Sequence, residues 1–329
     1  MPDLHLSLAM SPYDHVMDLL RGRVRAEGVT LTPIELSVEE IFFRMSTFQE
    51  WDAAEFAMGK YASLVAAGNP PFRAIPVFPS RMFRQSAIYV AHRAGIRDPR
   101  DLAGKRVGVP EWAQTAGIYV RGYLQHQCGM RPHDLRWVQA GVNESGRTEK
   151  ARLSLPSGVE LTAVPDRSLN EMLIAGDLDA IISAREPDAF VARDPRIRRL
   201  FPAYREVEAA YYRETGIFPI MHTVVVKVAV LDRHPWVAMN LLAAFEQAKV
   251  NSLNRLTSIV RPQLPIPWGD VLAAEVRETL GKDWWPYGLG ANRRTLTAFL
   301  QFCHEQGVTS RRLNVEELFP KEVTAHFAV

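Results

Sequence analysis

The chain has 329 residues, which is more than one ordinary hydrophobic core holds and enough for two lobes. Hydrophobic residues make up 47% and charged residues 23% of the sequence, the profile of a soluble globular protein. The 39 cations and 37 anions are well mixed and leave a net charge of +2, so no basic tract indicates a nucleic-acid partner. The longest apolar run, residues 224–231, contains a lysine and is too short to cross a membrane.

The N-terminal segment and the two cysteines bear on the cellular location. Residues 1–10 lack the basic head and the apolar core of a signal peptide, and their alternation of apolar and polar residues predicts a strand. Cys128 and Cys303 lie far apart and match no CxxC or zinc-binding spacing, so we expect free thiols. These features predict a cytoplasmic protein, and they leave a homo-oligomer open.

Strands and helices alternate through the first part of the chain. The expected strands are residues 4–10, 29–36, 52–57 and 74–78. The expected helices are residues 13–21 and 38–45, and the second has an acidic first turn that suits a helix N-terminus. This βαβα order predicts an α/β sheet with helices on its faces.

A second unit of the same kind begins near Ala91, after a short strand at 87–90. Its expected elements are strand 106–109, helix 114–127, strand 135–138, an exposed loop at 140–149, helix 169–174 and strand 179–184. From Phe218 the chain returns to a strand, which we place at residues 220–230. The remaining expected helices are 234–256, 268–280 and 293–306.

The segment 80–86 lies between two apolar runs and carries two arginines and two hydroxyls. A guanidinium group binds a carboxylate through two parallel hydrogen bonds. We therefore expect Arg81 and Arg84 to hold a carboxylate, with Ser80 and Ser86 as hydrogen-bond donors. The alternative is a turn whose arginines point into solvent.

Two phrases resemble the type II periplasmic binding proteins at the level of the fold. They are Asp101-Leu-Ala-Gly-Lys-Arg-Val-Gly-Val-Pro110 and Leu173-Ile-Ala-Gly-Asp-Leu-Asp-Ala180. In that fold one α/β lobe is interrupted by a second, two strands cross between the lobes, and the ligand lies in the hinge cleft. The resemblance implies a two-lobed α/β protein with a discontinuous first lobe, residues 1–90 plus 222–329, and an inserted second lobe, residues 91–221.

Further stretches resemble the 4,5-dihydroxyphthalate decarboxylase family over nearly the whole chain. They include Phe78-Pro-Ser-Arg-Met-Phe-Arg84, Arg106-Val-Gly-Val-Pro-Glu111, Ile182-Ser-Ala-Arg-Glu-Pro187, Gly216-Ile-Phe-Pro-Ile-Met-His-Thr223 and Trp284-Trp-Pro-Tyr-Gly-Leu289. The resemblance implies a carboxy-lyase that removes CO2 from a ring with two carboxylates and two hydroxyls, giving 3,4-dihydroxybenzoate. Residues 114–117, His15 and the proline-rich segment 261–268 depart from the family pattern and leave the ring substitution open.

Such a reaction needs a base near the phenol, an acid at the ring carbon and cations for the retained carboxylate. His222 is the first candidate for proton transfer, because it interrupts an apolar strand and histidine titrates near neutral pH. The alternative is a core histidine bonded to a backbone carbonyl. Glu111 follows a strand at the expected start of a helix, where α/β proteins place cleft residues. It could instead serve only the helix dipole.

Three more residues are candidates for binding. Arg185 ends the strand 179–184 and would face the same cleft, unless it pairs with a neighbouring acid. Thr115 lies where a helix opens, and the positive end of the helix dipole would add to an anion site. Asp14 lies in a strand-to-helix loop that could reach the cleft, although a helix cap explains it equally well.

The aromatic cluster at 284–287 could wall a pocket or pack a lobe interface. The reaction requires no redox cofactor, and the nine histidines show no HxxxH or HExxH spacing, so we expect no obligatory metal or other cofactor. The alternative is a metal held by carboxylates that folding brings together, which would leave no local signature. The expected ligand is a small aromatic carboxylate. One rival is a non-catalytic solute-binding protein for such an acid, which needs the arginines but no acid–base pair. Another is a different small-molecule enzyme on the same fold, similar to the late menaquinone-pathway enzymes.

Overall fold

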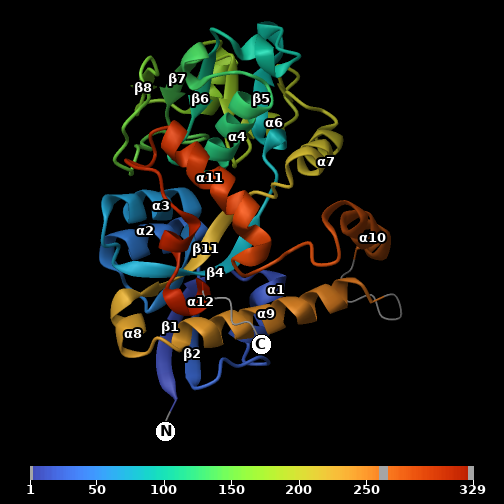
Figure 1. Ribbon diagram of the computed structural model, residues 1–329. Helices are drawn as coiled ribbons and strands as arrows, with labels where there is room; N and C mark the ends of the chain where they lie inside the picture. Colours follow the sequence, from blue (N-terminus) through green and yellow to red (C-terminus); the bar gives the residue numbers. More distant parts are fainter. Residues whose placement is uncertain (1–2, 259–265, 325–329) are drawn as a thin grey trace.

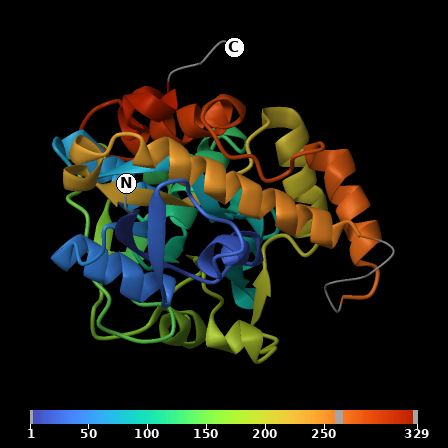
Figure 2. The same ribbon diagram turned by 90° about the horizontal axis from the view of Figure 1, so that it is seen from below.

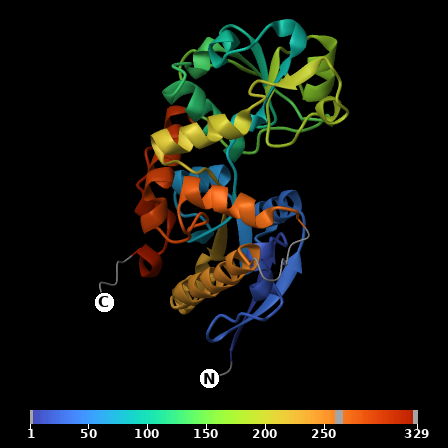
Figure 3. The same ribbon diagram turned by 90° about the vertical axis from the view of Figure 1, so that its right-hand side faces the viewer.

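The computed structural model describes residues 3–258 and 266–324. Two mixed sheets form two α/β lobes, which stand one above the other in Figure 3. The first sheet has the strand order β2-β1-β3-β11-β4 and the second has the order β10-β5-β9-β6-β7-β8. The predicted two-lobed α/β fold is confirmed.

The first lobe contains the N-terminal sheet and the helices that cover it. Its strands are β1 (Leu4–Met10), β2 (Val29–Glu35), β3 (Ala53–Ala57), β4 (Phe72–Arg81) and β11 (Ile220–Lys227). β11 runs antiparallel between β3 and β4, whereas β1 is parallel to both its neighbours. The helices are α1 (Asp14–Leu20), α2 (Val38–Phe48), α3 (Met58–Ala67), α8 (Val228–Arg233) and α9 (Val237–Leu256). The long helix α9 crosses this lobe in Figure 2 and packs on α1.

The second lobe contains the other sheet. Its strands are β5 (Ile88–Ala91), β6 (Arg106–Val109), β7 (Arg136–Gln139), β8 (Leu161–Ala163), β9 (Ala180–Ile182) and β10 (Ile197–Arg199). Its helices are α4 (Thr115–His126), α5 (Leu169–Ala175), α6 (Asp188–Val191) and α7 (Tyr204–Thr215). α10 (Gly269–Leu280), α11 (Arg293–Glu305) and α12 (Lys321–Thr324) follow near the C-terminus. No helix of the described residues is long and apolar enough to span a membrane.

The chain passes between the lobes twice, from β4 to β5 and from β10 through α7 to β11 (Figure 1). β5 already pairs with β9 and β10, so the first crossing precedes residue 91. The strand predicted at 220–230 ends at Lys227, and α8 replaces its last residues. The sequence patterns also missed α3, because six of its ten residues are buried and it shows no polar face to give a helical period.

Local capping explains where several elements begin and end. Ser168 accepts a hydrogen bond from the Glu171 N–H, and the Glu171 carboxylate accepts one from the Ser168 N–H, which starts α5. Gly176 ends α5 with a φ of 92°, a left-handed conformation that favours glycine. β9 follows directly, so the capped helix fixes where the strand 180–182 enters the sheet.

Helix α11 ties the C-terminal part of the chain to the second lobe, and Figure 1 shows it spanning the two lobes. Gln306, just beyond its end, is the attachment point. The Gln306 carbonyl accepts from the Trp112 indole N–H at 2.7 Å, and its side-chain oxygen accepts from Arg121 Nε at 2.8 Å. Its side-chain amide donates to the Ile118 carbonyl at 3.0 Å. The lobes are therefore joined at a third place besides the two crossings.

The lobes also touch at Gly59, in the first turn of α3. Its N–H donates to Thr115 Oγ1 of the second lobe at 3.0 Å. A Cβ added to Gly59 would lie 2.4 Å from the Ala113 carbonyl oxygen, which is closer than real Cβ contacts allow. Glycine is therefore required by the close approach of the two lobes.

We expect Gly59→Ala to lower the free energy of unfolding by about 1–3 kcal/mol, the usual cost of overpacking. The clash is with backbone, which cannot rotate away as a side chain can. Gly269→Ala is the matched control, because a Cβ there meets nothing within 4 Å. Denaturant unfolding of both variants tests this expectation, and equal stabilities would contradict it.

Candidate active site

A cavity of about 280 Å³ lies between the two lobes. Its walls come from α2, the start of α3, the first crossing, the turn between β6 and α4, the loop 147–151, the residue after β9, and β11. The lining residues are Val38, Glu39, Phe42, Phe43, Ala57, Lys60, Arg84, Glu111, Ala113, Gln114, Thr115, Ala116, Arg147, Glu149, Lys150, Ala151, Ala184, Met221 and His222. Both lobes contribute, so the cavity occupies the hinge cleft.

His222 lies on β11 and meets Glu55 of the neighbouring strand β3. Its Nδ1 is 2.6 Å from Glu55 Oε1. The His222 side chain is 17% exposed and lines the cavity, whereas the Glu55 side chain is fully buried. The edge of the Phe42 ring packs against the imidazole, with 4.9 Å between ring centroids. The ring is thus held by two neighbours, and its other nitrogen, Nε2, forms no hydrogen bond with the described residues.

Two further donors reach the Glu55 carboxylate. The Tyr13 hydroxyl donates to Oε1 at 2.6 Å, and the Ser11 N–H donates to Oε2 at 3.1 Å. Burial and the adjacent Glu55 charge raise the pKa of Tyr13 well above its usual value, so the phenol stays protonated. With His222, three groups therefore converge on this one buried carboxylate.

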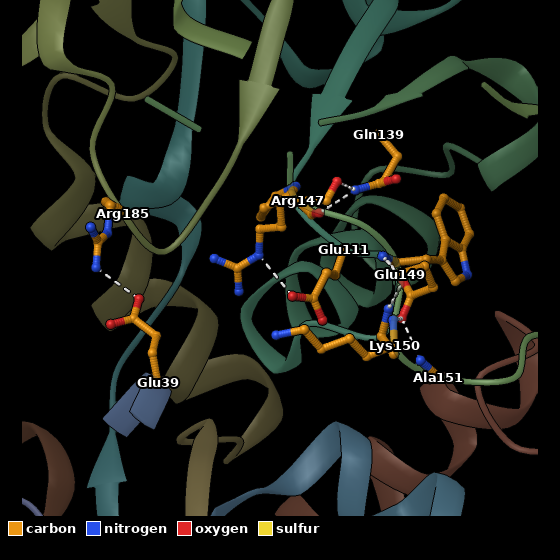
Figure 4. Close-up of polar contacts among 11 residues, drawn as sticks. Glu39, Glu111, Gln139, Arg147, Glu149, Lys150, Ala151 and Arg185 are labelled. Atoms are coloured by element: carbon orange, nitrogen blue, oxygen red, sulfur yellow. Dashed lines mark hydrogen bonds and ion pairs between the residues drawn. The ribbon is translucent and has the colours of Figure 1, made fainter. Parts of the chain in front are cut away.

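The opposite wall contains Glu111 and the loop 147–151, shown in Figure 4. Arg147 Nε donates to Glu111 Oε1 at 2.7 Å. Glu149 is used differently, because its carboxylate accepts from the backbone N–H groups of Trp112, Ala113, Lys150 and Ala151. Glu149 therefore fastens the loop to the turn before α4, and Glu111 keeps Oε2 without a hydrogen-bond partner among the described residues.

Arg84 brings a buried positive charge to the cavity. Its Nε lies 3.2 Å from the Met221 sulfur, and it forms no ion pair with any residue that the structure describes. Burial lowers the pKa of Arg84 to about 10, because the charged form is desolvated. A guanidinium in this position needs an anion, and the cavity is where one can reach it.

Lys60 and Lys150 add two more cations without ion-pair partners in the described parts of the chain. Burial, followed by the charge of Lys150, lowers the pKa of Lys60 below its usual value. The acids of the lining are already engaged, since Glu111 pairs with Arg147 and Glu39 pairs with Arg185. The cavity therefore carries excess positive charge and is suited to an organic anion.

The structure brings four of the predicted site residues together in this lining. They are His222, Glu111, Arg84 and Thr115. Thr115 begins α4, as expected, and its hydroxyl accepts the Gly59 N–H at 3.0 Å. Thr115 thus fixes the N-terminus of α4 at the cavity.

Arg81 does not line the cavity, which corrects its prediction as a carboxylate ligand. Its side chain is buried and donates to the carbonyls of Phe218, at 3.2 Å, and Pro286, at 2.8 Å. It also donates to the side-chain oxygen of Asn292. Through these hydrogen bonds Arg81 connects the end of β4 with the segment before α11, so it has a structural role.

Four other predicted binding residues also lie outside the lining. Arg185 forms a 2.7 Å ion pair with Glu39 across the lobes, as Figure 4 shows, instead of pairing with its sequence neighbours. Ser80 pairs with His222 in the β ladder but does not line the cavity. The Ser86 N–H donates to Glu208 at 3.0 Å. Asp14 accepts from Ser252 and forms an ion pair with Arg255.

The aromatic cluster packs the interior of the first lobe and lines no part of the cavity. The Trp285 indole N–H donates to the Phe78 carbonyl at 3.0 Å, and Trp284 and Tyr287 are buried. Within residues 3–258 and 266–324, no group of three His, Cys, Asp or Glu side chains is placed to hold a metal ion. Residues 261–265 of the proline-rich departure lie outside the described residues.

Sequence reasoning missed Glu55, Lys60 and Lys150. Glu55 gave the same signal as His222, a lone polar residue within an apolar strand, Ala-Ala-Glu-Phe-Ala. Lys60 is similarly isolated in the apolar helix α3. Lys150 lies in a polar loop, where no local pattern separates it from a solvated lysine.

The fold is shared with solved structures at low sequence identity. The chain superimposes on the periplasmic aliphatic sulphonate binding protein SsuA of Escherichia coli with a TM-score of 0.55 and 13% identity, covering 98% of this chain and 99% of that one. The desulfurization enzyme DSZB gives a TM-score of 0.54 and 15% identity, with 97% of each chain covered. One of these is named a binding protein and the other an enzyme, so the fold by itself decides nothing about activity.

Sequence comparison is more specific, although no protein-family profile matches the chain. The chain is 37% identical to 4,5-dihydroxyphthalate decarboxylase of Comamonas testosteroni over 320 residues, which cover 97% of both proteins. It is 38% identical over 214 residues to the protein of the same name from Pseudomonas putida, covering 65% of this chain and 83% of that protein. With this full-length similarity, the chain belongs to the 4,5-dihydroxyphthalate decarboxylase family.

Proposed function

We propose that this protein is a non-oxidative carboxy-lyase that converts 4,5-dihydroxyphthalate into 3,4-dihydroxybenzoate and CO2. The observation that supports this most directly is the cavity lining, which combines a histidine with three cations that have no ion-pair partner among the described residues. Its volume of about 280 Å³ is close to the lower end of ligand pockets, roughly 300 Å³, and therefore suits a ligand with one small aromatic ring. The two carboxylates of the substrate match the excess positive charge.

The chemistry explains why a proton donor is needed. Direct cleavage of the bond to the carboxylate would leave an aryl carbanion, which is too unstable to form. A hydroxyl para to the departing carboxylate offers another route, because its deprotonation pushes electrons into the ring. The carbon bearing the carboxylate can then take a proton, and CO2 leaves as aromaticity returns.

Five of the lining residues have a role in this route. His222 protonates the ring carbon through Nε2, the nitrogen that is not held by Glu55. Glu111 accepts the phenolic proton through Oε2, which has no hydrogen-bond partner among the described residues. Arg84 binds one carboxylate, and Lys60 with Lys150 neutralises the remaining negative charge.

The solute-binding alternative is not favoured. The structural neighbours share only the fold with this chain, whereas the decarboxylase similarity extends over 97% of it. A binding protein would also have no use for a histidine held by a buried carboxylate at the wall of the cavity. We further propose that the protein acts in the cytoplasm, as the sequence predicts; its oligomeric state stays open.

Anaerobic incubation of the purified, chelator-treated protein with 4,5-dihydroxyphthalate tests the proposal. We expect 3,4-dihydroxybenzoate by chromatography, and we expect phthalate, which lacks the para hydroxyl, to bind in calorimetry without being decarboxylated. Binding of 4,5-dihydroxyphthalate without product, even after divalent ions are added back, would instead indicate a solute-binding protein. If the protein neither binds 4,5-dihydroxyphthalate nor forms product from it, its substrate must be sought among other aromatic acids.

A further inference from the structure

We propose that Glu55 is a positioning residue for catalysis, which holds the His222 imidazole in the one tautomer that can exchange a proton with substrate. The inference rests on the proposed function for its catalytic consequence. The juxtaposition is a fully buried carboxylate on β3 and a half-buried imidazole on the adjacent strand β11, 2.6 Å apart. Glu55 itself does not line the cavity, so it acts through His222.

The hydrogen-bond pattern fixes which ring nitrogen carries the proton. A carboxylate can only accept, so the 2.6 Å contact requires a proton on Nδ1 of His222. In the neutral ring Nε2 then carries no proton. It is the nitrogen that remains available to a substrate in the cavity, because Nδ1 is bonded to Glu55. When the ring is protonated, Nε2–H is the donor for the ring carbon, while Nδ1–H stays bonded to Glu55.

Glu55 is itself held in place, so the arrangement is rigid. Ser11 and Tyr13 each donate to the carboxylate, and both come from the segment that joins β1 to α1. The edge of Phe42 packs on the imidazole from α2. A flip of the ring would move Nδ1 away from the carboxylate and lose this hydrogen bond, which is costly at a buried acceptor.

The alternative is that Glu55 only anchors the loop at Ser11 and Tyr13, with His222 as one more neighbour. The two roles predict different effects of the isosteric change Glu55→Gln. A glutamine has one side-chain oxygen, so it can keep the bond from Ser11 or the bond from Tyr13 but not both. With its oxygen towards Ser11, its amide faces Nδ1 and donates to it, which favours the wrong tautomer. In either orientation the glutamine carries no charge.

The closing experiment compares wild type, Glu55→Gln, Tyr13→Phe and Asp52→Asn. We expect Glu55→Gln to lower kcat for 4,5-dihydroxyphthalate by about 10²–10⁴-fold, the range of general acid–base catalysis, with KM within about threefold. Tyr13→Phe removes one of the two other donors to Glu55, and its loss of kcat should be smaller than that of Glu55→Gln. Asp52→Asn is the matched control, because Asp52 accepts from Ser7 beside the same sheet and lies outside the cavity. Asp52→Asn should keep kcat within about threefold of wild type.

Nitrogen-15 NMR of histidine-labelled protein gives a readout that needs no substrate. At alkaline pH we expect wild type, Tyr13→Phe and Asp52→Asn to show His222 protonated at Nδ1 alone, with the signals assigned by their loss in His222→Asn. Glu55→Gln should show a mixed or reversed tautomer. A wild-type ring protonated at Nε2, or an unchanged tautomer in Glu55→Gln, would overturn the proposal. If wild type fails to turn over the substrate, the proposed function fails while this test of Glu55 stands.

Discussion

Replacing His222 with alanine is expected to reduce kcat by about 10²–10⁴-fold, while the affinity for the substrate stays within about tenfold. The imidazole lines the cavity and is held by the buried carboxylate of Glu55. Among the described residues of this wall, no other titratable side chain is held by a buried acid. It therefore supplies the proton to the transition state and adds little to ground-state binding, which the cations provide. Single-turnover kinetics with calorimetry of substrate binding would measure both quantities.

His92→Ala is the control for this prediction. His92 is exposed, lies in a short 3-10 turn (His92–Ala94) after β5, and has no contact with the cavity lining. It should retain full activity. Equal losses of affinity and of rate in His222→Ala would instead make His222 a binding residue.

The second large effect is expected from Arg84→Met, which should weaken substrate binding by about 10–100-fold. The lost contact is a charge-assisted hydrogen bond from a buried guanidinium, worth about 1.5–3 kcal/mol. Arg84 forms no ion pair with the described residues, so its removal leaves no protein carboxylate without a partner. The free protein should for the same reason be as stable as wild type or more stable.

Arg81→Met provides the matched comparison. Burial lowers the pKa of both arginines to about 10, so the pKa does not distinguish them, although Arg81 is buried and Arg84 only partly so. Their hydrogen-bond partners do, because Arg81 has three oxygen acceptors within the protein and Arg84 has a methionine sulfur. Arg81→Met should lower the melting temperature with little change in affinity. If Arg81→Met weakened binding and Arg84→Met did not, the assignment of the two side chains would be reversed.

The two arginines also show what the segment 80–86 could and could not reveal. Its composition indicated an anion site, and one of its arginines does line the cavity. The strand β4 continues through Arg81, so that residue stays within the first lobe, and Arg84 lies beyond the strand, in the crossing between lobes. The two arginines are three residues apart, and the position at which β4 ends decides which of them reaches the cavity.

The sequence by itself determined the α/β class and most strands and helices, and it made His222 and Glu111 candidate residues. These follow from local patterns, since periodicity, turns and isolated polar residues are all encoded by near neighbours along the chain. The family and the two-lobed plan came instead from the resemblance of longer phrases to known proteins. Helices α3 and α7 were missed because α3 is buried on most sides and α7 is rich in polar residues.

Only the tertiary structure decided how the site is assembled. Glu55 and His222 are separated by 167 residues and meet because β11 returns to pair with β3. Lys60 of the first lobe and Lys150 of the second share a cavity because Gly59 lets the lobes approach closely. Contacts of this kind depend on sheet order and on the packing of the lobes, which no local pattern specifies, because the free energy that fixes them comes from burial of distant parts of the chain against one another.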